Sequence, residues 1–296
     1  MNAPSPLISA LMIATTGLMW GLNWPAVKFM LTEFEPVTVR AVAFPCAAVL
    51  LFGIAVIRRE RLRPTAEEFP KLLATGLFVI LGFNVLVSLG QVLTETSKAA
   101  IIAFTMPAIT AVLSVMFLGD RLNRLLLLSL FFGMGGLAVL ASQDIDGLMA
   151  APLGPVIMLL GALSWAIGTV LSKTRTWTLS PVVMAGWYFA ISTALAWPIA
   201  FVFESPADMS FPSLPVIGTL AFHVLGPMVL SYILWNMLVA RLPATVAAIT
   251  TLLVPIVGVS SSIILLGDPL TWHKVVALTM ILASIAITVI RPAGRG

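Results

Sequence analysis

Apolar residues follow one another in long runs along this chain, and short polar or charged stretches separate the runs. A helix needs roughly 20 apolar residues to cross the hydrocarbon core of a bilayer. Cutting the chain at its charged and Pro/Gly clusters gives ten such runs, at about 7–31, 36–57, 70–93, 97–118, 124–141, 152–172, 181–203, 213–239, 243–266 and 271–290. The pattern predicts an all-α integral membrane protein with ten transmembrane helices and no attached soluble domain.

Composition agrees with this interpretation, because 60% of the residues are hydrophobic and only 9% are charged, against roughly 25% charged residues in an ordinary soluble domain. The net charge of +4 is therefore not taken as a sign of nucleic-acid binding. Cys46 is the single cysteine, which excludes an intrachain disulfide. No Lys or Arg precedes the first apolar run, so we expect that run to be a spanning helix and not a cleaved signal peptide.

The cationic residues divide unequally between the two predicted sides of the membrane. Four lie on one side: Lys28, Arg40, Lys98 and Lys274. Twelve lie on the other: Arg58, Arg59, Arg61, Arg63, Lys71, Arg121, Arg124, Lys173, Arg175, Arg241, Arg291 and Arg295. Because cytoplasmic loops carry an excess of Lys and Arg, twelve against four predicts that both termini are cytoplasmic.

The chain also repeats itself. Shifted by 148 residues, AAIIAFTMPAITAVLSVMFLGDRL at 99–122 falls on AAITTLLVPIVGVSSSIILLGDPL at 247–270. Pro107 then meets Pro255, and both copies end on Gly-Asp twelve residues later. A shared proline, gap and ending are hard to obtain by chance in two apolar helices, so we predict two repeats, 1–146 and 147–296, of five spans each.

An odd number of spans in each repeat forces the two repeats into opposite orientations. At a shift of 145 residues Trp20 meets Trp165 and Lys28 meets Lys173. The two lysines then lie at opposite predicted faces, as inversion requires. Inverted repeats that meet near the bilayer midplane are a common plan for secondary transporters, because exchanging their conformations exposes one site to alternate sides.

These features resemble a known family. A Trp-Gly-x-Asn motif with a following lysine in the first span, and a proline followed by Leu-Gly-acid-x-Leu in spans four and nine, resemble the EamA-type exporters of the drug/metabolite transporter superfamily. Among these, the bacterial exporters of aromatic and other neutral amino acids are most similar. The chain departs from the family in carrying Asp120 and Asp268 where the acid is usually Glu. The resemblance implies export across the bacterial cytoplasmic (inner) membrane; it leaves amino acids, other metabolites and drugs open as cargo.

The stretch WGLNWPAVK at 20–28 is the most unusual part of the first span. Pro25 has no N–H and deprives the Gly21 carbonyl of its helical partner, so Gly21 and Pro25 predict a hinge. Trp20 and Asn23 lie deeper, and we expect them to contact substrate. Trp24 and Lys28 lie toward the outer end and are interpreted as gate or anchor residues. For Lys28 this interpretation is preferred to direct contact with substrate. Pro107 and Pro255 are further gate candidates.

Other spans supply polar and aromatic candidates for a substrate cavity. In span three Asn84, Ser88, Gln91 and Glu95 share one helical face, which indicates either a water path or interhelical hydrogen bonds. In span eight we select His223, Tyr232, Trp235 and Asn236; His223 is nearly opposite Tyr232 on an ideal helix unless Gly226-Pro227 bends it. A neutral structural role for His223 is as well supported as a functional one. Trp165 and Thr169 in span six and Tyr188 in span seven complete the candidates.

Aromatic walls with a few polar groups suit a small amphipathic molecule, and neutral or aromatic amino acids fit that description. The chain has no phosphate-cradling G-x-x-x-x-G-K-[ST] motif, so an ATP-driven pump is disfavoured. By the predicted boundaries every acid is at a span end or in a loop, which favours facilitated diffusion over proton coupling through His223. No nucleophile motif surrounds the serines at 258–262, so we predict no enzyme activity. We expect no cofactor or metal, no nucleic acid, the lipid bilayer and a small molecule as partners, and a monomer or weak dimer.

Overall fold

A computed structural model describes residues 6–94, 96–144, 151–266 and 270–290, and every regular element in these ranges is a helix. Eight helical stretches are long and apolar enough to cross a membrane. Two shorter apolar helices, 244–260 and 272–288, take the places predicted for spans nine and ten. The predicted all-helical membrane fold is confirmed, while Glu95, Gly267 and Asp268 lie outside the described residues.

Several predicted spans consist of more than one helical element. The first half contains α1 (Pro6–Met30), α2 (Thr38–Ile57), α3 (Phe69–Gly76), η1 (Leu77–Gly82), α4 (Phe83–Leu93), α5 (Thr96–Ala103), α6 (Met106–Leu118), α7 (Arg124–Ala141) and the short η2 (Ser142–Asp144). The second contains α9 (Leu153–Lys173), α10 (Pro181–Phe203), the short η3 (Pro206–Asp208), α11 (Leu214–His223), η4 (Val224–Leu230), α12 (Ser231–Arg241), α13 (Ala244–Thr250), α14 (Leu253–Leu266) and α15 (Trp272–Ile290).

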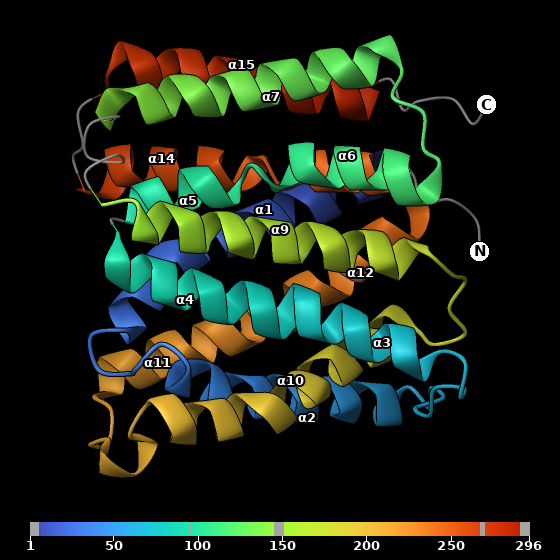
Figure 1. Cartoon of the computed structure of the whole chain (residues 1–296), viewed down its shortest axis with the longest axis vertical. Helices are drawn as coiled ribbons and strands as arrows, with labels where there is room; N and C mark the ends of the chain where they lie inside the picture. The colour runs from blue at the N-terminus through green and yellow to red at the C-terminus, as the bar shows by residue number, and fades with distance from the viewer. Residues whose placement is uncertain (1–5, 95, 145–150, 267–269, 291–296) are drawn as a thin grey trace.

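The helices lie roughly parallel or antiparallel to one another, and the two halves interleave (Figure 1). At one end of the view α7 packs along α15, and at the other α2 packs along α10. Between these pairs the halves exchange partners. The first helix of the first half, α1, packs on α11, α12 and α14, whereas α9, the first helix of the second half, packs on α3, α4 and α6. Each half therefore encloses the leading helix of the other.

Two spans are wound wider than an α-helix at equivalent places. The segments η1 and η4 are π-helices, and they end at Gly82 and Leu230, 148 residues apart. π-Helical turns bond residue i to residue i+5 and are frequently found at functional sites. Their carbonyls accept hydrogen bonds from the leading helix of the other half: Ser164 Oγ donates to the Phe78 carbonyl at 2.7 Å, and Trp20 Nε1 donates to the Pro227 carbonyl at 3.0 Å.

Spans four and nine are broken in the middle, also at equivalent places. The breaks fall between α5 and α6 and between α13 and α14, and Pro107 and Pro255 stand just after them. Pro is favoured in the first helical turn, where its missing N–H needs no partner. By contrast, α1 continues past Pro25 as one unbroken helix to Met30. Within the described residues, departures from a regular α-helix thus lie in spans three, four, eight and nine, whereas Gly21 and Pro25 lie inside an unbroken helix, and the hinge there stays a prediction.

A lysine near the end of each leading helix caps the third-span helix of its own half. Lys28 Nζ donates to the Gln91 carbonyl near the end of α4 at 2.6 Å. Lys173 Nζ donates to the Val239 and Leu242 carbonyls at the end of α12, at 2.8 and 3.0 Å. A helix leaves its last carbonyls unpaired and carries partial negative charge there, so a cation is stabilising.

Candidate substrate-binding cavity

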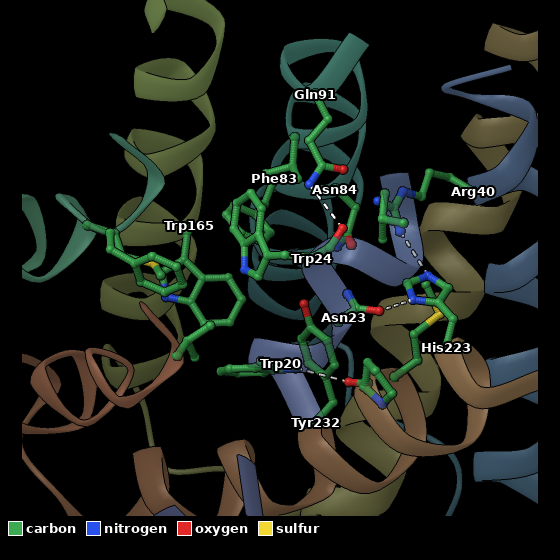
Figure 2. Close-up of a pocket in the computed structure, with 17 residues that line it drawn as sticks. Trp20, Asn23, Trp24, Arg40, Phe83, Asn84, Gln91, Trp165, His223 and Tyr232 are labelled. Atoms are coloured by element: carbon green, nitrogen blue, oxygen red, sulfur yellow. Dashed lines mark hydrogen bonds between the residues drawn. The ribbon is translucent and has the colours of Figure 1, made fainter. Parts of the chain in front are cut away.

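A cavity of about 50 Å³ lies between the leading helix α1, the elements of spans three and eight, and α9 (Figure 2). Side chains of α2, α6 and α14 complete its wall. Small-molecule pockets have volumes of roughly 300–1,000 Å³. The cavity therefore has space for only a few water molecules.

Aromatic rings form one side of this cavity. Trp20 and Trp165, which occupy equivalent positions in the two predicted repeats, meet edge to face with ring centroids 5.3 Å apart. Tyr232 lies 5.6 Å from Trp20, and Phe83 lies 5.0 Å from Trp165. Edge-to-face packing of this kind stabilises the rings relative to one another and leaves an apolar wall for a ligand.

The opposite side carries a hydrogen-bonded row of polar groups (Figure 2). Arg40 Nε donates to Ser88 Oγ at 2.8 Å, and Arg40 Nη1 lies 2.9 Å from His223 Nε2. Because a guanidinium has only donors, Nε2 must be the acceptor and the His223 proton is on Nδ1. That Nδ1 then donates to Asn23 Oδ1, 2.5 Å away. We call Ser88, Arg40, His223 and Asn23 the polar relay.

The π-helix η4 explains how His223 and Tyr232 both reach the cavity. Nine residues separate them, which on an ideal α-helix with 3.6 residues per turn puts them on opposite faces. The wider winding over Val224–Leu230 turns the chain less per residue. Both side chains consequently line the same cavity.

Two amides of α4 complete the polar lining. Asn84 Nδ2 donates to the Ile80 carbonyl of η1 at 2.9 Å. Gln91 is fully buried, and its Oε1 has no hydrogen-bond partner. The cavity lining thus includes a residue with an unpaired acceptor in addition to the polar relay.

The structure gathers seven of the twelve side chains predicted to bind substrate around this cavity: Trp20, Asn23, Asn84, Gln91, Trp165, His223 and Tyr232. Five others lie outside its lining: Ser88, Thr169, Tyr188, Trp235 and Asn236. Ser88 belongs to the polar relay, and Trp235 packs behind Trp20 and Trp165. Asn236 donates to the Pro181 carbonyl at 3.1 Å, while Thr169 and Tyr188 are buried away from the cavity.

The predicted gate residues have several different surroundings. Trp24 lines the cavity. Gly21 packs against Val257 of α14, whose side chain would collide with a Cβ there. Lys28 is the helix cap described above, and Pro25 lies inside the unbroken helix α1. Pro107 and Pro255 lie in the first turns of α6 and α14, just after the helix breaks.

Arg40 is the main lining residue that the sequence interpretation did not select. Its side chain is 1% exposed in α2, so counting it with the outer loop charges was incorrect, and the tally without it is twelve against three. The signal was present, since Arg40 falls inside the predicted span 36–57, where a charge marks a functional site by default. The apolar lining residues Val27, Phe83, Val87, Phe104, Met106, Pro227, Met228 and Val254 carried no such signal.

Carboxylates hydrogen-bond the two halves to each other at both ends of the helix bundle, which we call its edges. At one edge Glu68 accepts from the Thr178 N–H at 2.7 Å and from its hydroxyl. Burial raises the pKa of this carboxyl, but hydrogen bonds from Thr65 and Thr178 outweigh that effect, so its pKa is lowered from the ordinary 4.5. At the other edge Glu204 accepts from the Val37 and Thr38 N–H groups at 2.7 Å.

A second carboxylate lies at the Glu204 edge. Glu33 accepts from the Ser213 N–H at 2.7 Å and from its hydroxyl at 2.6 Å. The Ser213 hydroxyl and N–H lower the pKa of Glu33 below 4.5. Within the described ranges no three His, Cys, Asp or Glu side chains gather as a metal site would require.

Comparison with known proteins gives three results. The profile described as the EamA-like transporter family matches twice, over residues 7–142 and 152–290. An uncharacterized transporter of Bacillus subtilis, YvbV, is 27% identical over 94% of this chain and 90% of its own. A probable amino-acid metabolite efflux pump of Salmonella typhimurium is 26% identical over 92% of this chain and 91% of its own. A probable amino-acid metabolite efflux pump of Escherichia coli is 24% identical over the same shares of the two chains. A solved structure titled only as a crystal structure of a protein has the same fold, with a TM-score of 0.78, 16% identity and coverage of 95% of this chain and 96% of its own.

Proposed function

This chain belongs to the EamA-like transporter family, as the sequence resemblance predicted, and from that membership we propose that it exports small amphipathic metabolites, above all neutral and aromatic amino acids. The observation that carries the proposal is the central cavity, where the Trp20–Trp165 pair faces a row of polar groups. The rings suit an apolar side chain, and the polar groups suit the ammonium and carboxylate groups of an amino acid. Relatives named as amino-acid metabolite efflux pumps support the same cargo.

Alternating access between inverted repeats, 1–146 and 147–296, is the proposed mechanism. Its support is the recurrence of unusual features: π-helices ending 148 residues apart, a break in the fourth span of each half, and matched lysine caps. The family profile also matches each half separately. Two structurally equivalent halves can exchange conformations and so open one site to either side.

Opening is required because the cavity of about 50 Å³ is too small for an amino acid. The Glu68 and Glu204 contacts lie at opposite edges, and each joins one half to the other. Cargo would enter after the contacts at one edge part and leave after those at the other edge part. By the positive-inside rule we propose that the Glu68 edge and both termini face the cytoplasm of a bacterial inner membrane.

We favour facilitated diffusion, because no described carboxylate lines the cavity to take up a proton. We propose a monomer or weak dimer as the transporting unit. The alternative, a proton-coupled exporter of drugs or other metabolites, is supported by His223, a titratable group in the cavity wall.

The test is transport by the purified protein in liposomes. Labelled phenylalanine or tryptophan should move down its own gradient without ATP, with saturation and competition by the unlabelled compound. Flux should persist when internal and external pH are clamped equal, and loss of flux under that clamp would instead favour proton coupling. Failure with every neutral amino acid tested would remove this cargo assignment.

A further inference from the structure

We propose that Arg40 binds the carboxylate of the cargo, so that this transporter selects organic acids, amino acids included, and excludes amines and cationic drugs. The inference rests on the proposed function of the central cavity and specifies the chemistry of its ligand. It depends on the charge of Arg40, on the direction of the hydrogen bonds around it, and on the other groups that line the cavity.

Arg40 is a buried cation without an anionic partner. Its side chain is 1% exposed and lines the cavity, and arginine stays charged in proteins. Both of its hydrogen-bond partners, Ser88 and His223, are neutral acceptors. No described carboxylate lines the cavity, and the ion pair Arg58–Glu60 lies on the surface. An uncompensated buried charge is strongly destabilising, and in membrane spans such charges mark substrate pathways.

The polar relay presents only donors to the cavity on this side. Because Arg40 donates to Nε2, His223 carries its proton on Nδ1 and gives it to Asn23 Oδ1. This orients the Asn23 amide with its oxygen toward His223 and its nitrogen toward the cavity, as Figure 2 shows. A guanidinium beside an amide N–H₂ group matches a carboxylate, which only accepts.

The other requirement, a place for an ammonium group, is met by neutral groups of the cavity lining. Gln91 Oε1 is a buried acceptor without a partner. Trp20, Trp24 and Trp165 also line the space, and indole rings attract cations weakly. Neither feature carries a formal negative charge. An ammonium group is therefore tolerated when the cargo also has a carboxylate, whereas an amine alone meets a site whose only formal charge is positive.

Three ligands that share an indole ring separate these contributions: tryptophan, indole-3-propionate, which lacks the ammonium group, and tryptamine, which lacks the carboxylate. With the full-length purified protein we expect tryptophan and indole-3-propionate to raise the thermal unfolding temperature and to compete for flux in liposomes. Tryptamine should do neither. Equal binding of tryptamine and tryptophan would overturn the proposal.

Two variants test the role of Arg40 itself. Arg40→Met should weaken indole-3-propionate binding on the order of thirtyfold or more, since truncating one partner of a buried charge pair costs 2 kcal/mol or more and 1.4 kcal/mol is tenfold. Asn23→Asp keeps the acceptor for His223 and supplies an internal counter-ion to Arg40, so it should abolish carboxylate binding, permit tryptamine binding and preserve folding even if Arg40→Met does not. Unchanged acid binding in folded Asn23→Asp would refute the assignment. Arg63→Gln, at an exposed arginine, is the matched control and should behave as wild type.

The outcomes separate this inference from the proposed function. Flux of tryptophan and tryptamine alike, unaffected by Arg40→Met, would leave a transporter whose cargo is not selected by Arg40. Arg40-dependent binding of indole-3-propionate with no flux of any ligand would leave a carboxylate site in a protein that does not transport these compounds.

Discussion

The two halves of this transporter share a frame but differ in the chemistry that they place inside it. Equivalent lysines, Lys28 and Lys173, cap equivalent helices, each within its own half. Equivalent tryptophans, Trp20 and Trp165, meet at the centre and join the halves. The movement that we propose needs each half to keep its own structure, so these features need to be alike on both sides.

The difference is clearest three residues after the central tryptophans, where Asn23 in the first half corresponds to Gly168 in the second. Asn23 reaches His223 of α11 and completes the polar relay. Gly168 instead packs so closely on η1 that a Cβ would lie 2.9 Å from the Val79 nitrogen. The leading helix α1 therefore has space for a polar side chain at this position, whereas α9 packs against η1 with no space for one. The polar relay consequently lies on one side of the centre only, which suits the asymmetric cargo that we propose for this otherwise symmetric frame.

Replacing the two central tryptophans should give the largest effects and separate their roles. Trp165 is 2% exposed, so Trp165→Ala should lower the free energy of unfolding by about 3–5 kcal/mol. Trp20 is only half-buried, so Trp20→Ala should abolish transport with a smaller loss of stability. Thermal unfolding and liposome flux measure the two effects. If Trp20→Ala merely unfolds the protein, Trp20 is a packing residue and not a ligand contact.

Adding one carbon at Gly168 should break the close packing of the second half. Gly168→Ala forces α9 away from η1 and should destabilise the protein by about 1–3 kcal/mol, the range for overpacked cores. At the equivalent position Asn23→Ala removes atoms without a clash, so it should mainly impair ligand binding. Denaturation curves of the two variants, compared with Gly53→Ala at a glycine with open space around it, check this. Equal stability of Gly168→Ala and wild type would contradict the asymmetry.

The matched lysine caps should prove unequal in strength. Lys173 bonds two carbonyls and is half-buried, whereas Lys28 bonds one and is exposed. Because hydrogen bonds from charged groups contribute about 1.5–3 kcal/mol, Lys173→Met should cost about 2 kcal/mol and Lys28→Met about 1 kcal/mol. Unfolding of each variant in detergent gives the ranking, and the reverse order would show that exposure does not govern these caps.

The smallest expected effect concerns the edge closed by Glu68. Its pKa is lowered in the folded protein, so the stability that it contributes is present above its ordinary pKa of 4.5 and is lost as the pH falls through the folded value. Wild type should therefore lose thermal stability between about pH 5 and pH 3 more steeply than Glu68→Gln. Glu67→Gln, at an exposed neighbour, should keep the wild-type dependence. Parallel curves for wild type and Glu68→Gln would count against the interpretation.

The sequence was sufficient for the spans and for much of the cavity, because apolar runs and aligned polar residues are local patterns. It led to Trp20, Asn23 and Gln91 directly. It placed Arg40 with the loop charges, because hydropathy alone does not distinguish a charge near a helix start from one turned inward. It also left the face of His223 undecided, since only the π-helical winding of η4 brings that ring beside Tyr232.

The η4 segment has a consequence for how this transporter can change over evolution. Substitutions that restored ordinary α-helical winding over Val224–Leu230 without changing its length would turn each residue by about 100°. Nine such steps separate His223 from Tyr232, so the His223 ring would rotate off the cavity wall if α12 kept its place against α1 and α10. Such a change of winding, with no substitution in the polar relay itself, is thus a route by which a descendant of this protein could lose the relay and acquire a different cargo.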